Sequence, residues 1–441
     1  MTGVLPAEPH ESDDGESFAR RHVRHNVVAL SVDLGLFLVG LSFASQSTIL
    51  PAFAAHLGAS NLVIGAIPAL MTLGWNLPSL FWAGYTESLA RKLPFVLRYT
   101  IWERLPFLGL AAVAFFLARP APGLSLALML GMLLVITGVG GVLMPAWMDI
   151  VARAVPVGLR GRFFAVSSLL AGAGGLLGGV FTAWVLARMP APDGYAVCFL
   201  MAALCVGLSY AALARVREPR ASAVEVAPPL GAYLRRAGGL LREDRNLRWF
   251  LLSRALIHVG MMASGFYTVY ALRHYAAPDW SVGVFTTALL AGQMTGNVVL
   301  GALADRAGHL APLAIGAGAL LLANVGALLV PSLDLFLVVF ALQGVHLAAV
   351  NVSGLSVLLE FAPSPAARPT YVGLGTTLLT PVAFGGPLIA GIMADVFGFA
   401  AVFVVAALGS LAGLALLLVR VREPRHRPSG PSLSGSDATP P

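Results

Sequence analysis

The chain has 441 residues, of which 58% are hydrophobic and only 11% are charged. Because soluble domains carry about 25% charged residues, this composition excludes a soluble globular protein and predicts an integral membrane protein surrounded by membrane lipids. The formal charge of +7 does not indicate a nucleic-acid partner, because the basic residues stand at the ends of apolar segments.

Residues 1–26 are expected to form a polar cytoplasmic tail. They lack the short apolar core of a cleavable signal peptide, so the first spanning helix is expected to act as an uncleaved anchor. A spanning helix needs about 20 apolar residues. By that criterion the sequence predicts twelve spanning helices, at residues 27–49, 61–83, 95–118, 124–150, 163–187, 195–214, 247–272, 281–303, 310–331, 334–358, 370–393 and 398–419.

The longest internal connection, residues 215–246, separates six predicted helices from six. We therefore expect one six-helix bundle at 27–214, a second at 247–420, and a disordered cytoplasmic tail at 421–441. Within the cytoplasmic connection, leucines and a tyrosine between residues 230 and 241 stand among arginines, which is typical of a short amphipathic helix on the inner leaflet. The alternative is a solvated linker.

Lysines and arginines concentrate on one side of the predicted helices. If the N-terminus is cytoplasmic, twenty-two of the 28 fall in inside segments, whereas the outside loops hold only Arg119, Arg188 and Arg273. Cytoplasmic loops are the ones that carry an excess of these residues. Both termini are therefore predicted to be cytoplasmic.

The hexapeptide RVREPR occurs twice, at Arg215–Arg220 and at Arg420–Arg425. Each copy follows an apolar helix with a related sequence, GYAVCFLMAAL at residues 194–204 and GFAAVFVVAAL at residues 398–408. We expect the arginines to anchor the inner end of each helix and the proline to stop it. The glutamate is expected to tie the helix end to a neighbouring loop. The repeat predicts two homologous halves, an architecture found in transporters.

The stretch GALADRAGHLAPL, residues 301–313, stands between the eighth and ninth predicted helices. It resembles the signature loop of the major facilitator superfamily, and the matching residues are Gly301, Asp305, Arg306 and Gly308. The equivalent loop after the second helix reads AGYTESLARK, in which the corresponding residues are Ala83, Glu87, Arg91 and Lys92. Ser88 stands where the family has an arginine, so each copy of the loop is incomplete.

This resemblance covers essentially the whole chain and implies an all-α membrane protein with twelve helices in two pseudo-symmetric bundles. In the family, contacts at the signature loops latch the halves in one of two alternating states, a role that the resemblance transfers to Asp305 and Glu87. Small residues such as Gly301 and Ala83 are expected to let helices approach closely.

Ionisable residues inside the membrane are costly, so each one marks a candidate site. Asp33 lies in the first predicted helix, where it could carry a proton during transport; the alternative is a structural carboxylate paired with an arginine. Arg254 and His258 are four residues apart on the seventh helix and share a face. The alternative for Arg254 is a side chain that extends to the membrane surface. The alternative for His258 is a hydrogen-bonded side chain that packs between helices without a role in transport.

The tenth helix adds Gln343, His346 and Asn351 to the candidates for binding substrate or protons. The resemblance implies that helices 1, 4, 7 and 10 line the central cavity. Glu103 and Arg104 on the third helix are adjacent, so they project about 100° apart and do not face the same neighbour. The resemblance implies that the third helix is peripheral to the cavity, so we expect a structural ion pair within the first half. Asp149 lies near the inner edge and is also expected to be structural.

Together these observations predict a secondary transporter of the bacterial inner membrane, a monomer that moves a small neutral or amphipathic molecule by alternating access, coupled to protons and acting in efflux. The alternatives are an importer of a sugar or organic anion, with Arg254 as the anion's partner, and a membrane sensor that does not transport. No nucleotide-binding or hydrolase motif occurs in the sequence, so an enzyme is not expected. Neither a cofactor nor a metal site is expected.

Overall fold

The computed structural model describes residues 11–87, 89–218, 239, 242–364 and 367–424, and the side chains of these residues except 11–20, 80, 83, 84, 87 and 369. Every regular element in this part of the chain is helical. The elements are α1 (Glu11–Ser42), α2 (Ile49–His56), α3 (Asn61–Glu87), α4 (Leu93–Ala112), the π-helix η1 (Val113–Leu117), α5 (Pro122–Ala154), α6 (Val157–Arg188), α7 (Asp193–Leu213), α9 (Arg245–Met261), α10 (Phe266–His274), α11 (Ser281–Ala307), α12 (Leu310–Leu329), α13 (Leu333–Ser353), α14 (Ser356–Phe361), α15 (Arg368–Phe397) and α16 (Phe399–Arg420).

Twelve helical segments of the described chain are long and apolar enough to cross a membrane, and they confirm the predicted number. Six lie between Arg21 and Leu213 and six between Arg245 and Arg420. The amphipathic helix predicted in the connection falls mainly on residues 219–238 and 240–241, which are outside the described residues.

The first spanning helix ends earlier than predicted, at Ser42 instead of residue 49. A short turn follows, and α2 starts at Ile49 with Pro51 in its first turn. Proline has no N–H to donate to an earlier turn, so it is well tolerated in the first turn of a helix, where no such bond is needed. The seventh helix is also interrupted, between α9 and α10, where bonds such as Ser264 N–H to Met261 O span only three residues.

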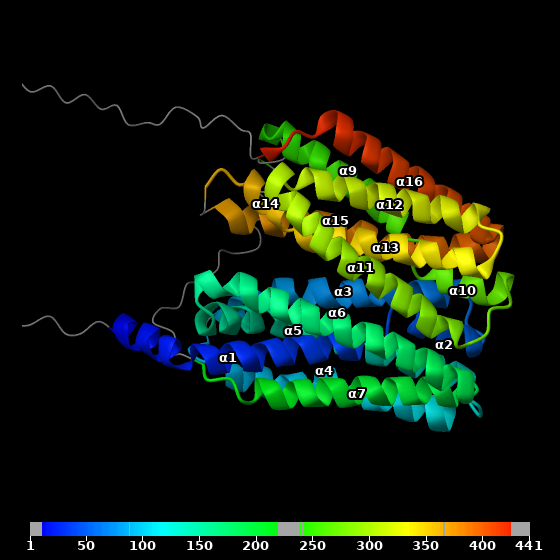
Figure 1. Cartoon of the computed structure of the whole chain (residues 1–441), viewed down its shortest axis with the longest axis horizontal. Helices are drawn as coiled ribbons and strands as arrows, with labels where there is room; N and C mark the ends of the chain where they lie inside the picture. Colours follow the sequence, from blue (N-terminus) through cyan, green and yellow to red (C-terminus); the bar gives the residue numbers. More distant parts are fainter. Residues whose placement is uncertain (1–10, 88, 219–238, 240–241, 365–366, 425–441) are drawn as a thin grey trace, which may run out of the picture.

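The helices form two groups in space, α1–α7 in the lower part of Figure 1 and α9–α16 in the upper part. Within each group the long helices run side by side along the same axis. In both groups the first helix is followed by a short helix, α2 or α10, near the end away from the tails. The two interrupted helices therefore repeat the same design, as the duplicated sequence predicts.

The two groups pack tightly against each other at the end opposite the tails. There α6 crosses α11, and a Cβ built on Gly283 would lie only 2.2 Å from the backbone nitrogen of Ala183. On the same crossing a Cβ on Gly179 would lie 3.0 Å from the nitrogen of Thr287. Glycine at these positions lets the two backbones approach without a side chain between them.

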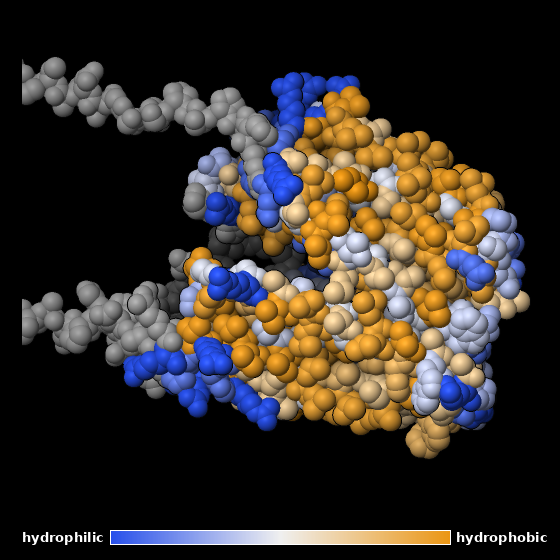
Figure 2. All heavy atoms as spheres, viewed as in Figure 1, coloured by the Kyte–Doolittle hydropathy of each residue, from blue (hydrophilic) through white to orange (hydrophobic). Residues whose placement is uncertain are grey.

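At the end where α1 begins and α16 ends, the surface is hollowed between the two groups (Figure 2). The same view shows a broad apolar band across this face of the molecule, with hydrophilic residues gathered at its two ends. The molecule is thus closed between its halves at one end and open at the other.

Candidate functional site

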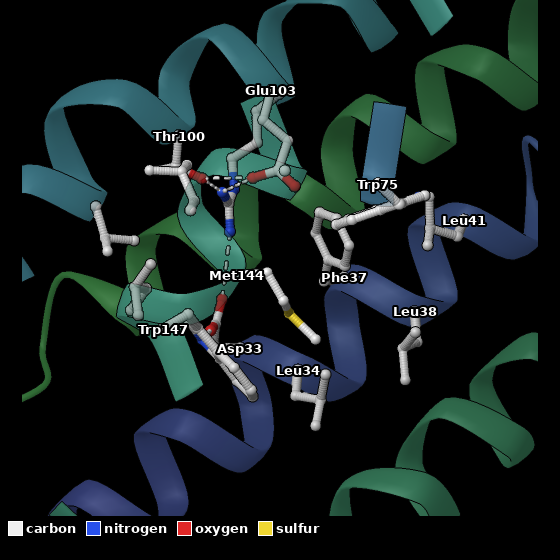
Figure 3. Close-up of a pocket in the computed structure, with 15 residues that line it drawn as sticks. Asp33, Leu34, Phe37, Leu38, Leu41, Trp75, Thr100, Glu103, Met144 and Trp147 are labelled. Atoms are coloured by element: carbon white, nitrogen blue, oxygen red, sulfur yellow. Dashed lines mark hydrogen bonds and ion pairs between the residues drawn. The ribbon is translucent and has the colours of Figure 1, made fainter. Parts of the chain in front are cut away.

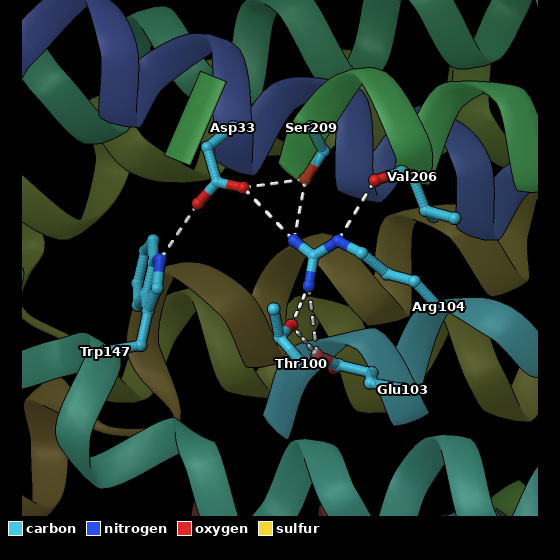
Figure 4. A network of polar contacts seen from close by, with 7 residues as sticks. All are labelled: Asp33, Thr100, Glu103, Arg104, Trp147, Val206 and Ser209. Carbon is cyan, nitrogen blue, oxygen red and sulfur yellow. Dashed lines mark hydrogen bonds and ion pairs between the residues drawn. The ribbon is translucent and has the colours of Figure 1, made fainter. Parts of the chain in front are cut away.

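Asp33 lies in α1 and is only 3% exposed. Its carboxylate accepts hydrogen bonds from the Ser209 hydroxyl at 2.6 Å and from the Trp147 indole N–H at 3.0 Å. The Arg104 guanidinium lies 3.3 Å from the same carboxylate (Figure 4). These partners come from α7, α5 and α4, so Asp33 joins four helices of the first half.

Arg104 is the centre of this polar cluster. Its guanidinium donates to the Ser209 hydroxyl at 2.9 Å and to the backbone oxygen of Val206 at 3.0 Å, and it also contacts Thr100. Its remaining ionic contact is with Glu103, 3.4 Å away. The predicted Glu103–Arg104 pair is therefore present, but Arg104 also reaches Asp33, which the sequence alone had assigned to a separate site.

The cluster of Asp33, Glu103 and Arg104 contains two buried carboxylates and one guanidinium. With all three groups ionised it carries a formal charge of −1. Burying a charge without a counterion costs several kcal/mol, so the arrangement is balanced when one of the two carboxylates holds a proton. Among the described residues, both ion pairs of these carboxylates are with Arg104.

A cavity of about 270 Å³ opens beside this cluster. Its wall is mostly apolar, with Leu34, Phe37 and Met144 facing the space in Figure 3, while Asp33 and Glu103 lie at its edge. The lining residues come from α1, α3, α4, α5 and α7, all in the first half. A ligand in this cavity would contact the cluster directly.

A second cavity, of about 230 Å³, lies where the two halves face each other. Asn76 of α3 lines it from the first half, and Arg254, His258, Thr376 and Thr380 line it from the second. Arg254 is only 6% exposed, so it does not reach the membrane surface as the alternative interpretation supposed. Among the described residues, no carboxylate forms an ion pair with it.

The candidates on the tenth helix separate in the structure. His346 is 2% exposed, with Nδ1 3.0 Å from the backbone oxygen of Gly316 and Nε2 buried without a partner among the described residues. Gln343 is buried and lies 3.4 Å from the Ser47 hydroxyl in the other half. Asn351 is exposed and lines neither cavity. Of the predicted second-half residues, Arg254 and His258 line one of the two cavities described here.

The first signature loop is held to the rest of its half by ion pairs. Lys92 is buried, and its Nζ lies 2.5 Å from Asp149, which also pairs with Arg153 at 2.6 Å. These ion pairs agree with a structural role for Asp149, which stays a prediction. Arg91 is exposed. The side chains of Ala83 and Glu87 lie outside the described residues, so the latch role predicted for Glu87 stays a prediction.

In the second signature loop, Asp305 and Arg306 are both exposed. The close approach expected at Gly301 is wrong for this conformation, because a Cβ built there would meet no atom within 4 Å. Gly308 has a φ of +86°, which favours glycine, and a Cβ there would lie 2.5 Å from the carboxyl carbon of Glu423. The second glycine of the motif is therefore required by local geometry.

Each copy of the hexapeptide binds the first long helix of its own half through an asparagine. Asn26 exchanges two hydrogen bonds with the backbone of Arg217, at 2.9 and 3.0 Å. Asn246 does the same with the backbone of Arg422, at 2.8 and 2.9 Å. The repeated sequence thus makes the same contact twice.

The glutamate of each hexapeptide caps the N-terminus of the third long helix in its half. Glu218 accepts hydrogen bonds from the backbone N–H groups of Lys92 and Leu93 at 2.7 and 2.8 Å, where α4 begins. Glu423 accepts from the N–H of Leu310 at 3.0 Å, where α12 begins. A carboxylate is favoured there because free N–H groups give a helix N-terminus partial positive charge. This confirms the expected tie to a neighbouring loop.

We expect Glu218→Gln and Glu423→Gln each to lower stability, because hydrogen bonds to a charged group contribute about 1.5–3 kcal/mol. Thermal unfolding of the purified protein in detergent measures the effect. Glu243→Gln, at an exposed position, serves as the control. Two variants as stable as the wild type would show that the caps contribute nothing.

The contacts that close the opposite end were not predicted from the sequence. His56 Nε2 lies 2.6 Å from Asp279 Oδ1, across the two halves. Asp395 of α15 accepts from the backbone N–H groups of Asn61 and the next residue at 3.0 and 3.1 Å, which caps α3 from the other half. Arg273 donates to the Asn61 side chain at 3.0 Å. The sequence offered one signal for these contacts, which is that charged residues occur in or beside short outer loops that otherwise carry few charges.

Comparison with known proteins agrees with this architecture. A family model described as the Major Facilitator Superfamily matches residues 32–334 and again residues 259–439. No curated protein matches the sequence.

Three solved structures illustrate the similarity in fold. A mutant of the nucleoside transporter NupG aligns with a TM-score of 0.69 and 13% identity over 89% of this chain and 98% of its own. A D-xylose–proton symporter aligns with a TM-score of 0.66 and 15% identity, over 90% of this chain and 98% of its own. A bacterial homologue of the iron transporter ferroportin, in an inward-facing state, aligns with a TM-score of 0.66 and 14% identity, over 89% of this chain and 98% of its own.

Proposed function

The chain belongs to the major facilitator superfamily, and on this premise we propose that it is a proton-coupled secondary transporter that works by alternating access. The observation that carries the proposal is the asymmetry between the two ends of the molecule. The halves are hollowed apart at the end with the tails (Figure 2) and joined at the other end by His56–Asp279 and the Asp395 cap. Rocking the halves would expose a central ligand to each side in turn.

The two termini are proposed to lie in the cytoplasm of a bacterium, with the protein in its inner membrane. The support is the distribution of lysine and arginine, which favours the end with the tails as the inside. In that orientation the structure is open to the cytoplasm. We propose that it acts as a monomer, since each copy of the chain has its own pair of halves and its own cavities.

Proton coupling is proposed to reside in the cluster of Asp33, Glu103 and Arg104. Its two carboxylates share one guanidinium, and Asp33 and Glu103 border a cavity that a substrate could enter. A proton taken up by the cluster from one side and released to the other would move with each transport cycle. The substrate is proposed to be small and amphipathic, because the second cavity, between the two halves, places Arg254 beside apolar residues such as Phe250.

The proposal is tested in two steps with the purified full chain. A thermal-shift screen against metabolites and drugs identifies ligands, and flux of a radiolabelled ligand is then measured in proteoliposomes with and without a pH gradient. Gradient-dependent flux is the expected result, and its direction distinguishes efflux from import. A ligand that binds and never crosses the vesicle membrane would contradict transport and favour a sensor.

We expect Asp305→Asn to reduce flux while leaving membrane insertion intact. Asp305 is exposed at the open end, where it is available to contact the other half when that end closes. Removing its charge would destabilise the closed state and slow the cycle. Flux and membrane content are measured together, and unchanged flux would remove the latch role.

A further inference from the structure

Arg254 is a buried cation inside the cavity between the two halves. It lies on α9 nine residues after Arg245, which is about 13 Å along the helix at 1.5 Å per residue. Its side chain is 6% exposed. None of its guanidinium nitrogens has a hydrogen-bond or ion-pair partner among the described residues, although it lines a cavity of about 230 Å³.

The groups around Arg254 do not supply a counterion. The residues that line the cavity include no aspartate or glutamate in the described chain. The hydroxyls of Thr376 and Thr380 donate to backbone oxygens of their own helix, at 3.0 and 2.8 Å. His258 Nδ1 lies 2.8 Å from the Arg254 carbonyl, so this nitrogen carries the proton and donates. The guanidinium is the one charged group that faces the cavity from these residues.

An unpaired guanidinium in a buried site costs several kcal/mol, which a bound anion would offset. We propose that the substrate carries a carboxylate and that Arg254 binds it in this cavity. This deepens the proposed function, on which it rests, by identifying the polar end of the amphipathic substrate. A planar guanidinium matches a carboxylate with two parallel hydrogen bonds.

The rest of the cavity suits the organic part of such a molecule. Phe250, Leu358 and Leu379 form apolar parts of its wall, and the volume is below the roughly 300–1,000 Å³ of sites for drug-sized ligands. One guanidinium balances a single negative charge. The site therefore fits a small monocarboxylate with an apolar body better than a phosphate.

The test compares sodium benzoate with its neutral isostere benzamide, and with inorganic phosphate, by titration of the detergent-purified full chain. We expect benzoate to bind at least tenfold more tightly than benzamide or phosphate. Arg254→Gln should abolish this preference, Arg254→Lys should keep part of it, and Arg98→Gln, at an exposed arginine of α4, should leave it unchanged. Benzoate binding that is equal in the wild type and Arg254→Gln, or no preference over benzamide or phosphate in the wild type, would overturn the inference.

Thermal unfolding without ligand separates binding from a structural role. Because Arg254 has no partner to lose among the described residues, Arg254→Gln is expected to be at least as stable as the wild type; a lower unfolding temperature would assign the arginine to the fold and overturn the inference. These measurements need neither a membrane nor a pH gradient. A protein that binds benzoate through Arg254 but transports nothing would contradict the proposed function alone, whereas normal transport of a neutral substrate by Arg254→Gln would contradict this inference alone.

Discussion

Asp33→Asn is expected to abolish accumulation driven by a pH gradient while substrate exchange between the two sides continues. In this variant Glu103 and Arg104 balance each other, so the cluster no longer needs a proton in any state of the cycle. The side-chain amide keeps the size of the carboxylate and can still accept from Trp147. The measurement is uptake of labelled ligand into proteoliposomes, once with a pH gradient and once as exchange at equal pH.

Asp334→Asn is the matched control, because Asp334 is an exposed aspartate at the start of α13. Glu103→Gln should behave like Asp33→Asn, since it also leaves one carboxylate for one guanidinium. If Asp33→Asn accumulates ligand under a pH gradient as the wild type does, the cluster does not carry the coupled proton. Proton coupling would then have to be sought elsewhere.

Arg104→Met is expected to have the largest effect on folding. Removing one partner of a buried ion pair costs about 3–5 kcal/mol, because it leaves the other charge unpaired. Here two carboxylates would lose their only described cation, and Ser209 and Val206 would lose a hydrogen-bond donor. The expected outcome is a much smaller yield of folded protein and a lower unfolding temperature, measured by size-exclusion chromatography and thermal unfolding in detergent.

The double variant Asp33→Asn/Arg104→Met tests the cause. It removes one negative charge together with the positive charge, so it should be more stable than Arg104→Met alone. Recovery of this kind attributes the loss to unpaired charge. If the double variant is no more stable than the single one, the loss comes from packing of the arginine side chain, which also lies 5.5 Å from the centre of the Phe37 ring.

Much of the fold follows from the sequence because the bilayer sets the length of an apolar helix. The twelve spans could be counted for that reason, and the duplicated hexapeptide predicted that two halves share one design. The interruptions at residues 43–48 (FASQST) and 262–265 (MASG) were missed, since both stretches are short, uncharged and flanked by apolar residues. Local hydrogen bonds, which hydropathy does not report, decide where such a helix ends.

The candidate site was harder to predict, because its partners come from different helices. Asp33 was a candidate because an ionisable side chain inside the membrane is costly. Pairing with an arginine was one of the two interpretations of this residue. Which arginine Asp33 meets depends on how α4 is rotated about its axis relative to α1. Glu103 and Arg104 are adjacent and point apart on the helix, but the long side chain of Arg104 reaches both Glu103 and Asp33. Trp147 and Ser209 gave no signal of their own, since neither side chain is charged.

Each hexapeptide ties three helices that precede it in the chain. Glu218 caps α4 and Arg217 pairs with Asn26, so every partner of the first copy has already been synthesised when the ribosome reaches it. Domains of a long chain fold in order during synthesis. The first half can therefore finish its own assembly in the membrane before any helix of the second half exists, and the second copy completes the other half once α16 has been made.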